Sequence, residues 1–133
     1  MQTPLVDTDV VSFLFKQDSR AALYTPHLKD TVPAISFATL AELERWALTR
    51  NWGKQRRQQL AEFLDDYVLL FPDAALCRKW AEVTEQVRRS GFKIEPGDAW
   101  IAATALQFGV PLVTHNRKDY AAVSGLTLIS EAP

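Results

Sequence analysis

Short apolar segments alternate along this chain with longer segments that have the periodicity of helices. The apolar segments predict strands at residues 5–6, 32–36, 68–71, 110–113 and 126–129. Strands that are each followed by a helix favour a parallel sheet with helices packed on both faces. We therefore expect an α/β fold of three layers, α/β/α, around a central, mainly parallel sheet of four to five strands.

The segments between these strands predict helices. They cover residues 8–15, 21–28, 39 onward to the glycine at 53, 54–65, 74–90, 96–108 and 117–123. Thr8 or Asp9 is expected to cap the first helix, because their side-chain oxygens can accept free backbone N–H groups. Thr39 is expected to cap the third, with Glu42 at the spacing of a capping box.

Composition excludes several classes of protein. The chain has 133 residues without repeats or linker-like stretches, so we expect a single domain over residues 1–133. Lys and Arg number 15 against 16 for Asp and Glu, so the chain has no overall positive charge of the kind that indicates nucleic-acid binding, although a local basic surface could still bind nucleic acid. No apolar run approaches the roughly 18 to 20 residues that cross a bilayer, so no membrane association is expected.

Cys77 is the only cysteine, which excludes an intramolecular disulfide. A protein without disulfides fits a reducing compartment, so a cytoplasmic location is expected. The thiol itself is predicted to be a small buried apolar group.

Carboxylates occur repeatedly where the predicted buried segments begin or end. They are Asp7 and Asp9 after the first strand, Glu42, Asp98, and Asp119 with Asn116 nearby. In parallel sheets, ligands gather at the carboxyl ends of the strands, where Asp7 falls. A charge directly after a buried strand is costly unless a partner neutralises it. The spacing therefore suggests that these groups converge around a cation.

Oxygen ligands without Cys or His favour Mg²⁺ or Mn²⁺ over zinc. Because Mg²⁺ keeps several waters, Asp7 and Asp98 are expected to bind the ion directly, and Glu42 and Asp119 through water. Such an ion lowers the pKa of a bound water and stabilises charge on phosphoryl oxygens, which suits hydrolysis of phosphodiesters.

Each of these acids also has a purely structural interpretation that the residues alone leave open. Asp98 follows Pro-Gly and is a good residue for a helix N-terminus. Glu42 is the possible capping-box partner of Thr39. Asp119 is a possible surface charge, and Asn116 a possible turn residue. Asp7 is the hardest to explain as a cap, because Thr8 and Asp9 are the more natural choices.

Four segments together resemble a known family. They are LVDTDV at residues 5–10, ISFATLAEL at 35–43, DAWIAATA at 98–105 and LVTHNRKDY at 112–120. In this order, and spread over nearly the whole chain, they are similar to the PIN domain, and within it to the VapC-type ribonuclease toxins of toxin–antitoxin pairs.

The resemblance implies a PIN-like fold with acidic residues clustered at one end of a parallel sheet. Asp7, Glu42 and Asp98 match the acidic triad of the family, and Asp119 or Asn116 matches its less regular fourth position. The remaining supporting positions are Thr114 and Asp9. Asp9 stands where the family usually has Asn, and Tyr120 stands where Phe is commoner, a change expected to be harmless.

The resemblance also implies an activity and partners. Members are Mg²⁺- or Mn²⁺-dependent endoribonucleases that hydrolyse RNA, are inhibited by a cognate antitoxin protein and often form homodimers. Arg117 and Lys118, beside the expected site, are candidates for binding RNA phosphates. A second basic cluster either binds RNA or is a solvated helix face; it comprises Arg50, Lys54, Arg56 and Arg57. Trp46 and Trp52 belong either to the core or to a groove for a partner.

Two other functions remain as alternatives. Asp7-Thr8-Asp9-Val10 after a strand resembles the start of haloacid-dehalogenase-type phosphatases, in which the first Asp is a nucleophile, but the rest of the chain matches poorly. The second alternative is a PIN-like binding module that has lost catalysis, which the retained acids disfavour.

Overall fold

The computed structural model describes residues 2–133. Within them, five short strands form one sheet, in which every pairing is parallel. The strands are β1 (Leu5–Val6), β2 (Ala34–Ser36), β3 (Val68–Leu70), β4 (Leu112–Val113) and β5 (Leu128–Ile129), in the spatial order β3-β2-β1-β4-β5. The predicted α/β class and parallel sheet are confirmed.

Helices connect and cover these strands. They are α1 (Thr8–Lys16), α2 (Ala21–Leu28), α3 (Phe37–Thr49), α4 (Lys54–Leu64), α5 (Ala74–Arg89), α6 (Pro96–Phe108) and the short 3₁₀ helix η1 (Arg117–Tyr120). Each predicted helix is present, with ends that differ by a few residues at most. No helix within residues 2–133 is long and apolar enough to cross a membrane.

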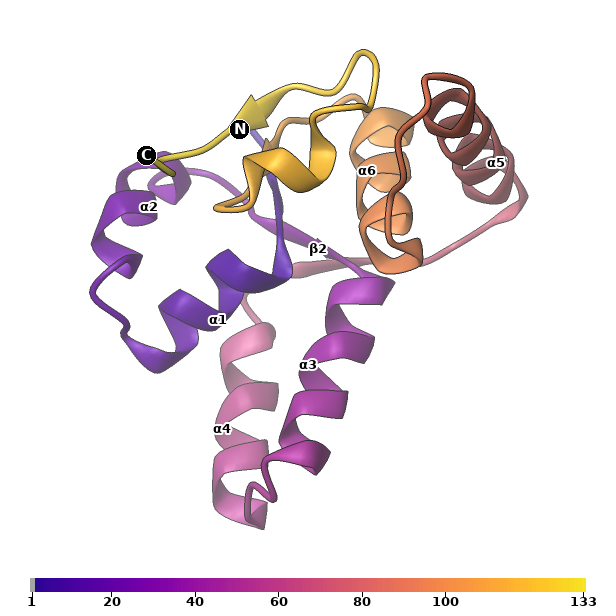
Figure 1. The fold of residues 1–133 in the computed structure, drawn as a ribbon. Helices are drawn as coiled ribbons and strands as arrows, with labels where there is room; N and C mark the ends of the chain where they lie inside the picture. The colour runs from indigo at the N-terminus through magenta and orange to yellow at the C-terminus, as the bar shows by residue number, and fades with distance from the viewer. Residues whose placement is uncertain (1) are drawn as a thin grey trace.

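Alternating side chains along the strands separate two hydrophobic cores, because successive residues of a strand point to opposite faces. Leu5, Ala34 and Leu112 belong to the core shared with α5 and α6. Their chain neighbours Val6, Ile35 and Val113 belong to the core shared with α1 to α4. In Figure 1, α5 and α6 lie together beyond one face of the sheet, and α3 and α4 project together from the other. The protein therefore has three layers, with the sheet between two layers of helices.

Strand order places the candidate site. The chain adds β2 and β3 on one side of β1, and β4 and β5 on the other. Helical connections therefore diverge at the carboxyl ends of β1 and β4, which creates a crevice where α/β proteins bind ligands. Asp7 follows β1, and Thr114 follows β4.

Two predicted helix caps are wrong. Asp7, and not Thr8 or Asp9, caps α1, since its carboxylate accepts the N–H of Thr8. Ser36 caps α3, because the helix already begins at Phe37. Thr39 is therefore inside α3, and its hydroxyl accepts a hydrogen bond from the Thr8 hydroxyl. Glu42 is not a capping-box residue.

Cys77 is exposed, which contradicts the prediction of a buried thiol. On α5 the buried positions are Leu76, Val83 and Val87. Cys77 follows Leu76 by one residue, a rotation of about 100° around the helix that turns its side chain toward solvent.

Candidate active site

Asp7 stands at the centre of the crevice, with only 5% of its surface exposed. Its Oδ1 accepts the backbone N–H of Thr8 at 2.7 Å, and its Oδ2 accepts the hydroxyl of Thr114 at 2.7 Å. Burial raises the pKa of Asp7, and these hydrogen bonds act in the opposite direction. Asp7 therefore both caps α1 and presents a carboxylate that lacks a cationic partner among these contacts.

Asp9 is half-buried in the first turn of α1, two residues after Asp7. Its Oδ1 accepts the N–H of Val10 at 2.7 Å, and its Oδ2 accepts the N–H of His115 at 3.1 Å. Burial, and next the charge of Asp7, raise the pKa of Asp9 to about 7. This carboxylate joins the start of α1 to the loop after β4.

Asp98 enters from the first turn of α6. The hydroxyl of Tyr120, on a ring that is almost completely buried, donates to Asp98 Oδ1 at 3.3 Å. Burial raises the pKa of Asp98 to about 7, and the charges of Asp7 and Asp119 add to this effect. Asp98 and Asp7, 91 residues apart in the sequence, thus lie close enough for the charge of one to act on the other.

Glu42 reaches the site from the second turn of α3, and Gly97 makes room for it. A Cβ atom added at Gly97 would lie 2.9 Å from Glu42 Oε1. Burial raises the pKa of Glu42, a hydrogen bond from Thr8 lowers it, and the charge of Asp7 raises it. Glu42 therefore belongs to the same electrostatic group as Asp7.

The loop after β4 forms the outer wall. The hydroxyl of Thr114, which is fully buried, accepts the N–H of Asn116 at 3.1 Å and so links this loop to Asp7. The side chains of Asn116 and Asp119 are exposed. Although it lies on the surface, Asp119 contributes to the raised pKa values of Asp7 and Asp98.

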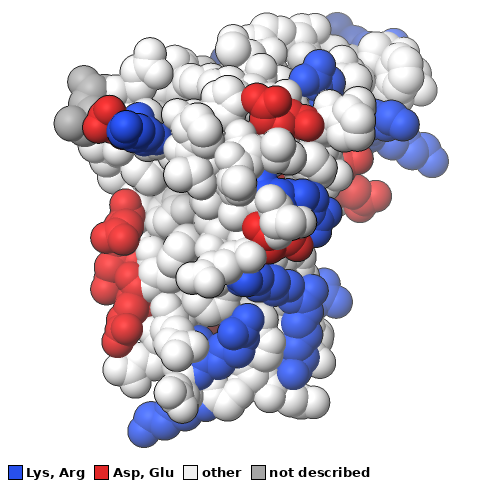
Figure 2. All heavy atoms as spheres, turned by 90° about the vertical axis from the view of Figure 1, so that its left-hand side faces the viewer, with Lys and Arg blue, Asp and Glu red and all other residues white. Residues whose placement is uncertain are grey.

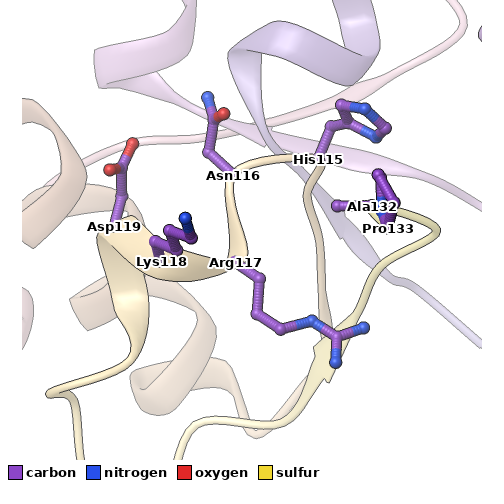
Figure 3. Close-up of a pocket in the computed structure, with 7 residues that line it drawn as sticks. All are labelled: His115, Asn116, Arg117, Lys118, Asp119, Ala132 and Pro133. Atoms are coloured by element: carbon purple, nitrogen blue, oxygen red, sulfur yellow. The ribbon is translucent and has the colours of Figure 1, made fainter.

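A cavity of about 460 Å³ opens beside this loop. It is lined by residues 115–119 together with Ala132 and Pro133 (Figure 3). The guanidinium of Arg117 extends away from Asp119 and donates to the carbonyl of Ser130 at 3.0 Å. Of the two predicted RNA-binding cations, Arg117 is thus held against the chain near β5.

The charges of the site call for a cation. Desolvation and mutual repulsion raise the pKa of Asp7, Asp9, Glu42 and Asp98, and a divalent ion would relieve both effects. The donors are oxygens, the type that Mg²⁺ and Mn²⁺ prefer. Within residues 2–133, no group of three or more His, Cys, Asp or Glu side chains is arranged so that it could hold a metal ion without side-chain movement.

Three supporting features were not found from the sequence. Tyr120 was expected to be a harmless replacement of Phe, yet its hydroxyl contacts Asp98. Gly97 looked like a helix-start residue, but it also admits Glu42. The Tyr24 hydroxyl lies 2.5 Å from His115 Nδ1, beside the bond between His115 and Asp9. Of these three features, only Tyr120 could have been suspected from the sequence, because its hydroxyl directly follows the predicted site residue Asp119.

Comparisons with known proteins agree with this geometry. The sequence model of the PIN domain family matches residues 5–126. Ribonuclease VapC1 of Haemophilus influenzae is 28% identical over 130 residues, which is 92% of each chain. Ribonuclease VapC5 of Mycobacterium tuberculosis is 34% identical over 94 residues, or 69% of each chain.

A solved structure shares the fold. The crystal structure of VapBC-5 from Mycobacterium tuberculosis, a member of the VapBC family of toxin–antitoxin systems, contains a chain that is 27% identical. It superimposes with a TM-score of 0.70 over 98% of this chain and 99% of that one. The three-layer architecture is therefore the one found in that family.

Proposed function

The chain belongs to the PIN domain family, among its VapC-type ribonucleases, and from this premise we propose which residues carry out its reaction. Asp7 and Asp98 bind a divalent ion directly, while Glu42 and Asp119 bind through water. Asn116, Thr114 and Asp9 hold these ligands in place. One observation carries the proposal: the carboxylates of Asp7 before α1, Glu42 in α3 and Asp98 in α6 all have raised pKa values, and they lie close enough together that the charge of Asp7 raises the pKa of the other two.

Mg²⁺ or Mn²⁺ is the proposed ion, because the donor set consists of oxygens. When bound, it would supply a water of lowered pKa and stabilise the charge on the phosphoryl oxygens. The residues of the chain have separate tasks. Thr114 and the N–H of Thr8 fix the two oxygens of Asp7, and Tyr120 fixes Asp98. The loop at 115–119 forms the wall against which the RNA lies, and Lys118 faces its phosphates.

We further propose that the chain is the toxin of a type II toxin–antitoxin pair and is held inactive by a cognate antitoxin. The relatives named VapC and the VapBC-5 structure support this role. The homodimer and the cytoplasmic location stay predictions; the single cysteine is consistent with the latter.

Cleavage of RNA by the antitoxin-free protein tests these roles. We would treat the purified protein with EDTA, incubate it with bulk tRNA or ribosomal RNA, and then add Mg²⁺ or Mn²⁺. Cleavage is expected only with the ion, and it should be lost in Asp98→Asn. The matched control is Asp66→Asn, which removes one exposed carboxylate between α4 and β3. It should cleave as the wild type does.

The same experiment separates the alternatives. Wild-type protein that is loaded with metal and free of antitoxin, yet cleaves no RNA, would indicate a binding module without catalysis. Transfer of a phosphoryl group to Asp7 would indicate a phosphatase of the haloacid-dehalogenase type. Cleavage that persists in EDTA would contradict the metal site.

A further inference from the structure

A groove leaves the acidic centre and follows α3 outward. Its volume is about 580 Å³, and Glu42 and Asp98 line its inner end. Arg45, Trp46 and Thr49 continue it along the helix. Positions three and four residues apart share one face of a helix, so these side chains form a continuous wall with Glu42.

Cations lie over the rings of Trp46, which lines this groove, and of Trp52, which does not. Lys16 Nζ lies 5.9 Å from the centre of the Trp46 ring, and the Arg50 guanidinium lies 4.8 Å from it. The Arg56 guanidinium lies 4.6 Å from the centre of Trp52. We call these five residues, Lys16, Trp46, Arg50, Trp52 and Arg56, the aromatic–basic patch. In the view of Figure 2, Lys and Arg side chains gather on the lower part of the molecule, where α3 and α4 project in Figure 1, and a column of Asp and Glu lies at its left edge.

The charge of this patch is not neutralised internally. Partial desolvation, and next the charges of Arg50 and Arg56, lower the pKa of Lys16. Among the ion pairs within residues 2–133, none includes Lys16, Arg50 or Arg56. The contacts with aromatic rings hold these side chains in place while their N–H groups remain exposed. An anionic ligand would therefore meet cations that are already ordered.

We propose that the aromatic–basic patch anchors the RNA strand whose phosphodiester bond is cleaved at the acidic centre, with the groove along α3 joining the two. This inference rests on the proposed ribonuclease function. A cluster of carboxylates repels RNA, so affinity must come from cations nearby. Glu42 lies in α3 and Arg50 directly follows this helix, eight residues further on, which corresponds to a rise of about 12 Å. Cations combined with aromatic side chains are also how proteins bind single-stranded nucleic acid without reading its sequence.

An RNA strand fits this surface better than an acidic protein segment does. The groove runs directly into the centre where the scissile phosphate must lie, so one strand with regularly repeated phosphates spans both sites. The acids that line the groove, Glu42, Glu95 and Asp98, repel phosphates and protein carboxylates alike, so the continuity of the groove with the proposed reaction centre is what favours RNA.

Salt-dependent binding tests this proposal. Every protein would carry Asp98→Asn, so that a fluorescein-labelled 20-nucleotide polyuridylate is not cleaved in Mg²⁺ buffer. The patch variant combines Lys16→Gln, Arg50→Gln and Arg56→Gln. The matched control combines Arg78→Gln, Arg88→Gln and Arg89→Gln, three exposed cations of α5. In the patch variant, the slope of log affinity against log salt should fall by about 2, since each phosphate contact on a single strand adds about 0.7. The control should keep the wild-type slope.

An unchanged slope in the patch variant overturns the proposal. So does a 20-residue polyglutamate that binds the patch as tightly as the RNA, an outcome that assigns the surface to an acidic protein. If the triple variant unfolds at a lower temperature than the wild type, each single variant must still lower the slope of log affinity against log salt by about 0.7. Arg56→Lys, which keeps the charge, should retain the slope. Because binding is measured apart from cleavage, a failure here is distinct from failure of the proposed nuclease.

Discussion

The acidic centre and the aromatic–basic patch each gather charges of one sign, yet they do so in opposite environments. The acids are buried to different degrees at the carboxyl ends of β1 and β4, and burial is the main cause of their raised pKa values. The cations are exposed on α1, α3 and α4 and rest on tryptophan rings.

The difference indicates what each region requires. Like charges in water repel weakly because solvent and salt screen them, so the patch persists at little cost. Repulsion between buried carboxylates is screened much less, and a bound cation would reduce it. We therefore interpret the acidic centre as a site that an ion completes, and the patch as a surface that attracts a polyanion. The effects of substitutions in the two regions should therefore differ, both in magnitude and in the property that changes.

The largest effect is expected from Asp7→Asn. The amide keeps the size of the side chain but removes the charge that we propose to bind the ion. Metal catalysis stabilises the transition state by several kcal/mol, so kcat/KM for RNA cleavage should fall by about 10³-fold or more. Cleavage assays at saturating Mg²⁺ measure this loss. The variant for comparison is Arg50→Gln, in the patch, which should leave kcat nearly unchanged. If kcat fell as far as in Asp7→Asn, the two regions would not have the separate roles described here.

Gly97→Ala comes next. The new methyl group would meet Glu42 Oε1 at 2.9 Å, and the flexible end of Glu42 would move aside. Because a displacement of about 1 Å at an active site costs up to about 10²-fold, kcat should fall by about 10- to 100-fold. Thermal unfolding should change little, since only a side-chain end moves. A large drop in the melting temperature would instead mean that α6 itself shifts.

Thr114→Val should have an intermediate effect. It removes the hydroxyl that donates to Asp7 and accepts from the N–H of Asn116. The buried carboxylate of Asp7 and the partly buried N–H of Asn116 then lose a partner, and the free energy of unfolding should fall by about 1 to 3 kcal/mol. Urea denaturation in EDTA measures the change. Thr114→Ser, which keeps the hydroxyl, is the control and should retain most of the stability.

A smaller effect should appear as a pH dependence of the metal-free protein. The pKa values of Asp9 and Asp98 are about 7 in the folded state, above the ordinary value of 3.8. The folded state therefore binds more protons than the unfolded state between these values, and stability is lost as the pH rises from about 4 to about 7. Melting temperatures in EDTA across this range measure the trend. Asp9→Asn combined with Asp98→Asn should flatten it; a melting temperature that rises with pH would contradict the raised pKa values.

Cys77→Ser should have the smallest effect. The thiol is exposed on α5, away from both charged regions, and surface substitutions of this kind usually change stability by less than about 0.5 kcal/mol. Urea denaturation should give the wild-type midpoint. A pronounced loss of stability would show that this face of α5 is covered.

The sequence predicted the strands, the sheet and the main acids because their signals are local. Leu5-Val6 before Asp7, and Asp98 at the start of a helix rich in alanine, need no distant residue for their recognition. The residues that cap α1 and α3 were harder to predict from the sequence. Thr8, Asp9 and Ser36 all have side chains that cap helices, and the choice among neighbours depends on where the backbone leaves the strand.

What the sequence by itself determined was the alternation of strand and helix and the acids beside them, since periodicity and polarity are properties of the chain. Tertiary structure decided which charges meet. It brought Tyr120 to Asp98, and Gly97 to Glu42. It also placed Lys16 of α1 over Trp46 of α3, and so turned cations that are far apart in the sequence into one surface. Such encounters depend on packing between elements, which no single segment of the chain specifies.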